Sequence, residues 1–173
     1  MMEQPGTAPA KEHRKTFTIE RTFRATAKEL WDLWTTREGL ESWWGPGGFT
    51  TKVHRLDIRP GGRFEYEMTA TGPEQIEAMK KANLPLVSRA GSTYTEIKPP
   101  RRLAYKTMTD FIPGITPYEI VAVVEFRPVA DGVRLVITRD TMHNEEWTRM
   151  SVMGMDSSLD RLARVVEEKR KKT

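Results

Sequence analysis

Four ionisable side chains in the second half of the chain, Glu96, Asp110, Arg139 and His143, could act as an acid, a base or an anion anchor. General acid and base chemistry requires such groups within hydrogen-bonding reach of a substrate, which sequence spacing alone does not establish. Arg139 and Glu96 are the most informative, because both share a strand face with apolar or aromatic residues and an unpaired buried charge is costly. Two interpretations stay open: both side chains line a cavity, where they could pair, or the ends of their strands have left the core.

His143 and Glu146 stand three residues apart, a spacing that two metal ligands on one helix could use. Two ligands are too few for a metal site, and the other histidines, His13 and His54, fall in different predicted segments. We therefore expect a hydrogen-bonding or structural role for His143, with no metal and no cofactor. The sequence also contains no HExxH motif, no phosphate-binding loop, no dinucleotide fingerprint and no GxSxG elbow.

The composition narrows the classes of partner. The chain has 173 residues, no cysteine and a formal net charge of +4, and residues 169–172, KRKK, supply that whole excess. The positive balance therefore reflects one chain end rather than a nucleic-acid-binding face. No segment approaches the roughly 20 consecutive apolar residues of a membrane span, and the first residues lack the apolar core of a signal peptide. We expect a cytoplasmic protein with no nucleic-acid partner and no membrane insertion.

Aromatic residues are concentrated in the segment before the first glycine-rich turn. The tryptophans of this segment are Trp31, Trp34, Trp43 and Trp44. They are most simply core residues, and the alternative is a wall on which a ligand stacks, because ligand sites are mostly apolar with a few polar anchors. The aromatic side chains that could complete such a wall are Tyr66, Tyr94, Tyr105 and Trp147.

Residues 110–114, DFIPG, form an apolar loop together with Tyr118. An exposed apolar loop requires cover. It could fold over the mouth of a cavity near Met142 and His143, pack against a partner subunit, or rest on its own domain. Phe111 is the residue of this loop that we take as a candidate ligand contact.

The elements that must position these side chains follow from periodicity and turn residues. Thr26 and Glu29 form a capping box, and Asn144 can cap a helix whose first turn is acidic. The expected order is a mobile leader at 1–15, a strand at 16–24, helices at 26–35 and 36–44, strands at 50–59 and 63–71, an inserted helix at 73–83, strands at 92–97, 103–109, 118–127 and 133–141, a long helix from 144 to about 169, and a basic tail at 170–173. This order predicts one α+β domain over residues 16–169, in which the sheet must curl to cover a single long helix.

The long C-terminal helix has an unusual inward stripe. The stripe comprises Trp147, Ser151, Gly154, Ser158, Leu162 and Val165, and the bulky residues at its border are Met150, Met155 and Leu159. Three members of the stripe are small. Small residues either let the helix approach the sheet closely or leave room for a ligand beneath it.

Five segments in order carry a family resemblance: RTFRATAKELWDLWT, WWGP, LDIRPGGRF, YTEIKPPRRLAY and the terminal helix. Together they resemble the START-like, or SRPBCC, superfamily of helix-grip folds, which includes the birch-pollen allergen and is also called Bet v 1-like. Within it, the chain is most similar to proteins homologous to the activator of the heat-shock-protein-ninety ATPase. The resemblance implies a seven-stranded antiparallel sheet wrapped around the C-terminal helix, a cavity between them, and two short helices that close one end.

The sequence departs from this family in two places, the insertion at residues 73–89 and Met155, where many relatives place a tryptophan. Both changes could reshape the cavity, so no ligand is transferred from a relative. We expect the cavity to bind a small apolar or aromatic molecule without covalent chemistry. The alternatives are a co-chaperone-like or self-associating interaction module, and a lyase, cyclase or hydrolase that acts in the same cavity. The candidate ligand-binding residues are Trp31, Trp34, Trp44, Tyr66, Tyr94, Glu96, Tyr105, Phe111, Arg139, His143, Trp147, Ser151, Gly154, Met155 and Ser158.

Overall fold

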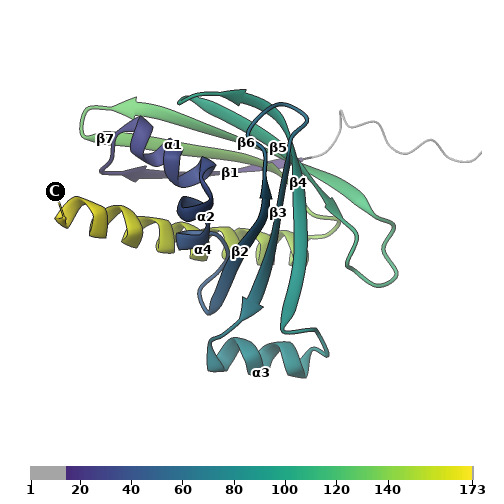
Figure 1. Ribbon diagram of the computed structural model, residues 1–173. Coiled ribbons are helices and arrows are strands. Elements are labelled where there is room, and N and C mark those ends of the chain that lie inside the picture. The colour runs from purple at the N-terminus through teal and green to yellow at the C-terminus, as the bar shows by residue number, and fades with distance from the viewer. Residues whose placement is uncertain (1–14, 173) are drawn as a thin grey trace, which may run out of the picture.

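The computed structural model describes residues 15–172, which form one antiparallel sheet and four helices (Figure 1). The leader predicted at residues 1–15 lies outside the described residues, apart from Lys15. The helices are α1 (Ala27–Thr35), α2 (Arg37–Trp43), α3 (Pro73–Lys81) and α4 (Glu145–Lys171). The strands are β1 (Thr16–Phe23), β2 (Phe49–Leu56), β3 (Arg63–Ala70), β4 (Val87–Lys98), β5 (Arg102–Thr109), β6 (Tyr118–Val129) and β7 (Gly132–Asp140).

The strands follow the order β1-β7-β6-β5-β4-β3-β2, so β2 to β7 form a continuous meander and β1 closes on β7. Figure 1 shows β2, β3 and β4 turned steeply against β1, β6 and β7, with α4 lying along the inner side of the bend. A twisted sheet of this size cannot lie flat against a single helix. The predicted α+β architecture is confirmed, including the two short helices after the first strand and the inserted helix.

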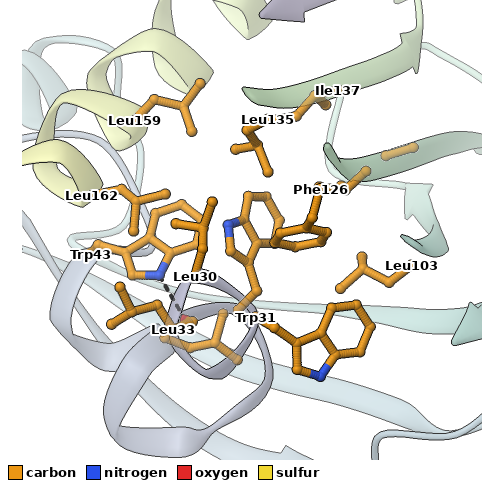
Figure 2. Close-up of a cluster of buried hydrophobic side chains, with 14 of the residues drawn as sticks. Leu30, Trp31, Leu33, Trp43, Leu103, Phe126, Leu135, Ile137, Leu159 and Leu162 are labelled. Atoms are coloured by element: carbon orange, nitrogen blue, oxygen red, sulfur yellow. Dashed lines mark hydrogen bonds between the residues drawn. The ribbon is translucent and has the colours of Figure 1, made fainter. Parts of the chain in front are cut away.

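A cluster of buried side chains fills the space between α1, α2, the C-terminal half of α4 and strands β6 and β7 (Figure 2). Leu30 and Leu162 are fully buried, and the Trp31 ring packs edge-on against Phe126 at a centroid distance of 5.3 Å. The Trp43 indole donates a 2.8 Å hydrogen bond to the Leu33 carbonyl, the dashed line in Figure 2. Each large apolar side chain buried in this way contributes about 1.5–3 kcal/mol, so this end of the fold supplies much of its stability.

Local signals define the helix ends. Thr26 and Glu29 form the expected capping box, and the Asn144 side chain accepts a 2.9 Å hydrogen bond from the Trp147 amide at the start of α4. Helix α4 continues to Lys171, two residues beyond the predicted end, because Arg170 and Lys171 extend its basic last turn and suit the helix dipole. No helix among the described residues is long and apolar enough to cross a membrane.

Two strand boundaries differ from the sequence prediction by three residues or more. Strand β4 begins at Val87 rather than at residue 92, because residues 87–91 pair with residues 65–69 of β3 although they are not strongly β-forming. Strand β2 ends at Leu56 rather than at residue 59. The inserted helix α3 is therefore held between two long paired strands and lies across their end in Figure 1.

Candidate functional site

The space between the sheet and the N-terminal half of α4 is a cavity of about 1160 Å³. Its sheet wall includes Tyr66, Met68, Ser92, Tyr105, Thr107 and Arg139, and its helix wall includes Trp147, Ser151, Gly154, Met155 and Ser158. Trp44, Met79, Leu84, Phe111 and Met142 complete the apolar part of the lining. The same pair of elements that builds the core at one end thus encloses a hollow at the other.

A cross-strand row on the concave face brings a tyrosine and an arginine together. Tyr105 of β5 pairs in register with Ala122 of β6, and Ala122 pairs with Arg139 of β7. Residues in such a row point to the same face of a sheet, and adjacent strands lie about 4.8 Å apart. Because the residue between them is alanine, the long side chains of Tyr105 and Arg139 can approach each other above it.

Arg139 is half-buried in this wall, and its side chain has neither an ion pair nor a hydrogen bond within residues 15–172. Its guanidinium acts electrostatically on Tyr66 and Tyr105, which places it near both phenols. Of the two sequence interpretations, Arg139 fits the first: it lines a cavity. A guanidinium presents five donors in a planar fork, so this side chain offers an open binding position for an acceptor.

Glu96 does not line the cavity, which corrects that candidate. A bulge between Tyr94 and Glu96 shifts the register, so that Tyr94 pairs with Tyr105 but Glu96 pairs with Ala104. The extra residue moves the Glu96 side chain to the outer face of the sheet. There Glu96 accepts 2.9 Å contacts from Lys98 and Arg102, and these two cations lower the pKa of its carboxyl group.

The tyrosines of the wall are neutral hydrogen-bonding groups at physiological pH. Burial raises the pKa of Tyr105 to about 12, although the Arg139 guanidinium acts in the opposite direction. Burial also raises the pKa of Tyr66, against opposing effects of Trp44 and Arg139. Tyr94 is buried and does not line the cavity. Its pKa is also raised, mainly by burial and to a smaller extent by the electrostatic effect of Tyr105.

The small residues of α4 form part of the cavity wall on the helix side. A Cβ atom added to Gly154 would meet no heavy atom within 4 Å, so this glycine faces open space. The Ser158 hydroxyl donates to the Gly154 carbonyl at 3.0 Å, as helical serines often do. The Ser151 hydroxyl is buried but has no partner in the described structure. The small residues thus leave space for the cavity beneath the helix. Ser151 also contributes to the cavity wall a hydroxyl group that forms no hydrogen bond in the described structure.

The tryptophans divide between core and cavity. Trp31 and Trp34 are buried in the core and do not line the cavity, because their spacing on α1 directs both toward Phe126. Trp44 follows the last residue of α2 and does line it, with ring centroids 5.2 Å from Phe64 and 5.9 Å from Tyr66. The ligand-wall alternative therefore applies to Trp44 and not to Trp31 or Trp34.

Aromatic and apolar side chains surround the mouth of the cavity. Phe111 lies 6.0 Å from Trp147 between ring centroids and is 65% exposed, so the apolar loop reaches the mouth without closing it. His143 is exposed and lies outside the lining; its Nδ1 is 2.8 Å from the Tyr118 hydroxyl. This contact ties the start of α4 to β6 and agrees with the hydrogen-bonding role expected for His143.

The sequence analysis missed the contacts that hold the closed end in place. Arg161 Nη1 lies 3.3, 2.9 and 3.3 Å from the carbonyl oxygens of Trp44, Gly45 and Pro46. The Gly47 amide donates to the Ser157 hydroxyl at 2.9 Å. These bonds fix the turn after α2 to the middle of α4. No local pattern signals them, because the partners are more than a hundred residues apart in the chain.

Of the four ionisable candidates from the sequence, Asp110 and Arg139 belong to the cavity lining. Glu96 and His143 lie outside it, Asp110 is exposed at the mouth, and no group of three potential metal ligands occurs among residues 15–172. A second hollow of similar volume lies between α1, α2 and the end of α4, but it contains none of the predicted site residues. The arrangement around Arg139 is therefore the best candidate site.

Comparison with known proteins agrees with this geometry. Residues 24–167 match the family described as Activator of Hsp90 ATPase homolog 1-like protein. A search of curated proteins finds no match. The match spans the fold from the end of β1 to the last turns of α4, so it includes the whole cavity.

Several solved structures share the fold. A protein from Chromobacterium violaceum is 23% identical, with a TM-score of 0.71 over 88% of this chain and 96% of its own. An AHSA1 protein from Silicibacter pomeroyi is 20% identical, with a TM-score of 0.70 over 90% and 99% of the two chains. An AHSA1-like protein from Aeromonas hydrophila is 20% identical, with a TM-score of 0.68 over 90% and 94%. At these identities the likeness establishes the fold.

Proposed function

The chain belongs to the family of Activator of Hsp90 ATPase homolog 1-like proteins, within the SRPBCC or Bet v 1-like superfamily, and we propose that it binds a small apolar or aromatic molecule between the sheet and α4. The observation that carries the proposal is the open space at Gly154. A helix that used glycine for close packing would have backbone or side-chain atoms at contact distance from that position. Here the glycine widens a cavity.

The size and lining of the cavity support this function. Ligand sites of small molecules usually occupy about 300–1,000 Å³ and combine apolar walls with a few polar anchors. The cavity of about 1160 Å³ is large enough, and Trp44, Trp147 and Met155 supply apolar surface. Arg139 and Ser151 supply polar groups without partners in the described structure.

Tryptophan fluorescence tests the proposal, because Trp44 and Trp147 both line the cavity and should respond to a ligand. The titration uses a panel of fatty acids, aromatic acids and their neutral analogues. Gly154→Leu should fill the space beneath the helix and weaken binding at least tenfold while the fold is kept, since leucine favours a helix by about 1 kcal/mol over glycine. The matched control is Met153→Leu, one residue away on the same helix and 65% exposed, which should bind as the parent does.

Two results would count against ligand binding in this cavity: no panel member binds the parent chain, or Gly154→Leu and the parent bind with equal affinity. Circular dichroism of both variants separates loss of the site from loss of the fold.

A second candidate function is an interaction module, favoured by the exposed apolar side chains Phe111, Met150 and Met153. Apolar groups of this size on a surface often mark a contact with another protein. Size-exclusion chromatography of the chain, alone and mixed with the heat-shock-protein-ninety chaperone, tests this function together with the chaperone's ATPase rate. A monomeric elution profile with no complex and no change in rate would remove it. The catalytic alternative has weaker support, because Glu96 and His143 do not line the cavity.

A further inference from the structure

We infer that the ligand is an organic anion, an apolar or aromatic body with one acidic group, and that the acidic group pairs with Arg139. The inference rests on the proposed ligand-binding function and specifies the chemical class of the ligand. Two features support it: an arginine side chain that pairs with no carboxylate in the described residues, and hydroxyl groups in the walls of the same cavity.

Arg139 differs from the other arginines in comparable surroundings. The partly buried arginines among residues 15–172 are Arg21, Arg63, Arg102, Arg139 and Arg161. Arg21, Arg63 and Arg102 each pair with a carboxylate at 2.7 to 3.3 Å, and Arg161 donates to backbone carbonyls. Arg139 has no such partner in the described part of the chain, although removing a guanidinium from water without compensation is costly. A negatively charged ligand would supply the missing compensation.

The acidic residues near the cavity do not fill this role. Glu65 and Asp110 belong to the cavity lining, but Glu65 pairs with Arg63 at 3.3 Å and Asp110 is exposed at the mouth. Asp140, next to Arg139, accepts a 2.9 Å hydrogen bond from the Val121 amide on the neighbouring strand. Neither of the carboxylates that line the cavity, Glu65 and Asp110, forms an ion pair with Arg139 within residues 15–172, so the Arg139 charge is left without a partner there.

Hydroxyl groups line both walls of the cavity that contains Arg139. The charge of Arg139 acts on the phenols of Tyr66 and Tyr105, but burial raises the pKa of both groups and keeps them protonated at neutral pH. Both phenols can therefore donate hydrogen bonds to an anion. Ser151 on the helix wall has a buried hydroxyl without a partner. A bidentate arginine with added hydroxyl donors matches the geometry of a carboxylate or sulfonate. Trp44, Trp147 and Met155 would contact the apolar body.

Two fluorescent probes with nearly the same body test the inference directly. Anilinonaphthalene sulfonate carries an anionic group, and N-phenylnaphthylamine is its neutral counterpart. Dissociation constants are measured for both probes with the parent chain and with the variants Arg139→Gln, Arg139→Lys and Arg134→Gln. Arg134 is the matched control, because it lies on the same strand with its side chain exposed on the other face.

The parent should bind the anionic probe about ten- to a hundredfold more tightly than the neutral one, the range expected for hydrogen bonds to a charged group. Arg139→Gln should abolish this preference, Arg139→Lys should keep part of it, and Arg134→Gln should keep all of it. Dodecanoate should displace the bound probe more effectively than dodecanol, which shows that a carboxylate is accepted in place of the sulfonate.

Equal binding of both probes by the parent, or an unchanged preference in Arg139→Gln, would overturn the inference and leave the proposed function standing. If neither probe binds and no panel member changes the tryptophan fluorescence, the proposed function fails as well. The comparison of the two probes on the parent chain needs no variant, so it stays decisive even if an Arg139 variant does not fold.

Discussion

Replacing Gly154 by alanine should stabilise the protein, although the residue lies on the side of helix α4 that lines the cavity. Glycine inside a helix costs about 1 kcal/mol relative to alanine, because it loses more backbone freedom on folding. Whether this gain is realised depends on the space available to the new methyl group. At Gly154 that methyl group would meet no heavy atom within 4 Å, so no packing strain offsets the gain.

The expected magnitude is therefore close to the full difference in helix propensity, about 1 kcal/mol. For a chain of this size, that corresponds to a rise in Tm of about 2–4 °C. Differential scanning calorimetry and urea unfolding followed by circular dichroism measure the change independently, and the two estimates should agree if unfolding is two-state.

The same substitution at Gly39 is the matched control. Gly39 lies in helix α2, but a Cβ atom there would be 2.7 Å from the Asp32 carbonyl oxygen and 2.7 Å from Leu33 Cα. These are backbone atoms that cannot move away cheaply, so Gly39→Ala should destabilise by about 1–3 kcal/mol. A lower Tm for Gly154→Ala would refute the reasoning, because it would mean that α4 packs against the sheet at that residue and that the cavity is filled.

Two further predictions concern the closed end and the sheet wall. Arg161→Met should destabilise the protein by about 2 kcal/mol in urea unfolding, because three carbonyl groups of the turn after α2 lose their donor. The control is Arg164→Met, because Arg164 is exposed and lies one helical turn further along α4. This substitution should change the stability by less than about 0.5 kcal/mol. Stability should fall between pH 10 and pH 12, because the ordinary pKa of 10.0 applies to Tyr105 in the unfolded chain while burial raises it to about 12 in the folded one. As the pH rises, Tyr105 therefore loses its proton first in the unfolded state, and the free energy of unfolding decreases by roughly 1 kcal/mol per pH unit. The free energy of unfolding of Tyr105→Phe should decrease less steeply with pH. Equal slopes for the variant and the parent would contradict the assignment to Tyr105.

The sequence predicts features that depend on neighbouring residues in the chain. The capping box at Thr26 and Glu29 and the cap at Asn144 are local, and each is found as expected. Alternation in β7 also places Arg139 correctly on the face of Leu135 and Ile137, because that strand has no irregularity before its end. Within these elements, periodicity is enough to determine which side chains share a face.

Features that depend on distant partners are not predictable in the same way. The bulge in β4 reverses the face of Glu96, and it is visible only in the pairing of β4 with β5. Trp34 and Trp44 look alike as aromatic residues of two short helices, but Trp34 packs into the core and Trp44 lines the cavity. The difference arises because Trp44 follows the end of α2, at a turn whose carbonyls Arg161 fixes to α4.

Three local costs to stability coincide in the walls of one cavity. Glycine at position 154 weakens its helix by about 1 kcal/mol relative to alanine, and the buried hydroxyl of Ser151 forgoes a hydrogen bond at a cost of about 1–3 kcal/mol. Arg139 is half-buried without a partner in the described structure. The other half of α4 offsets these costs, since Leu159 and Leu162 project into the buried cluster in Figure 2. Natural sequences that break local rules together at one place commonly do so at a functional site. The coincidence is therefore better explained by a ligand that uses the space, the hydroxyl and the charge than by packing, which would have removed all three.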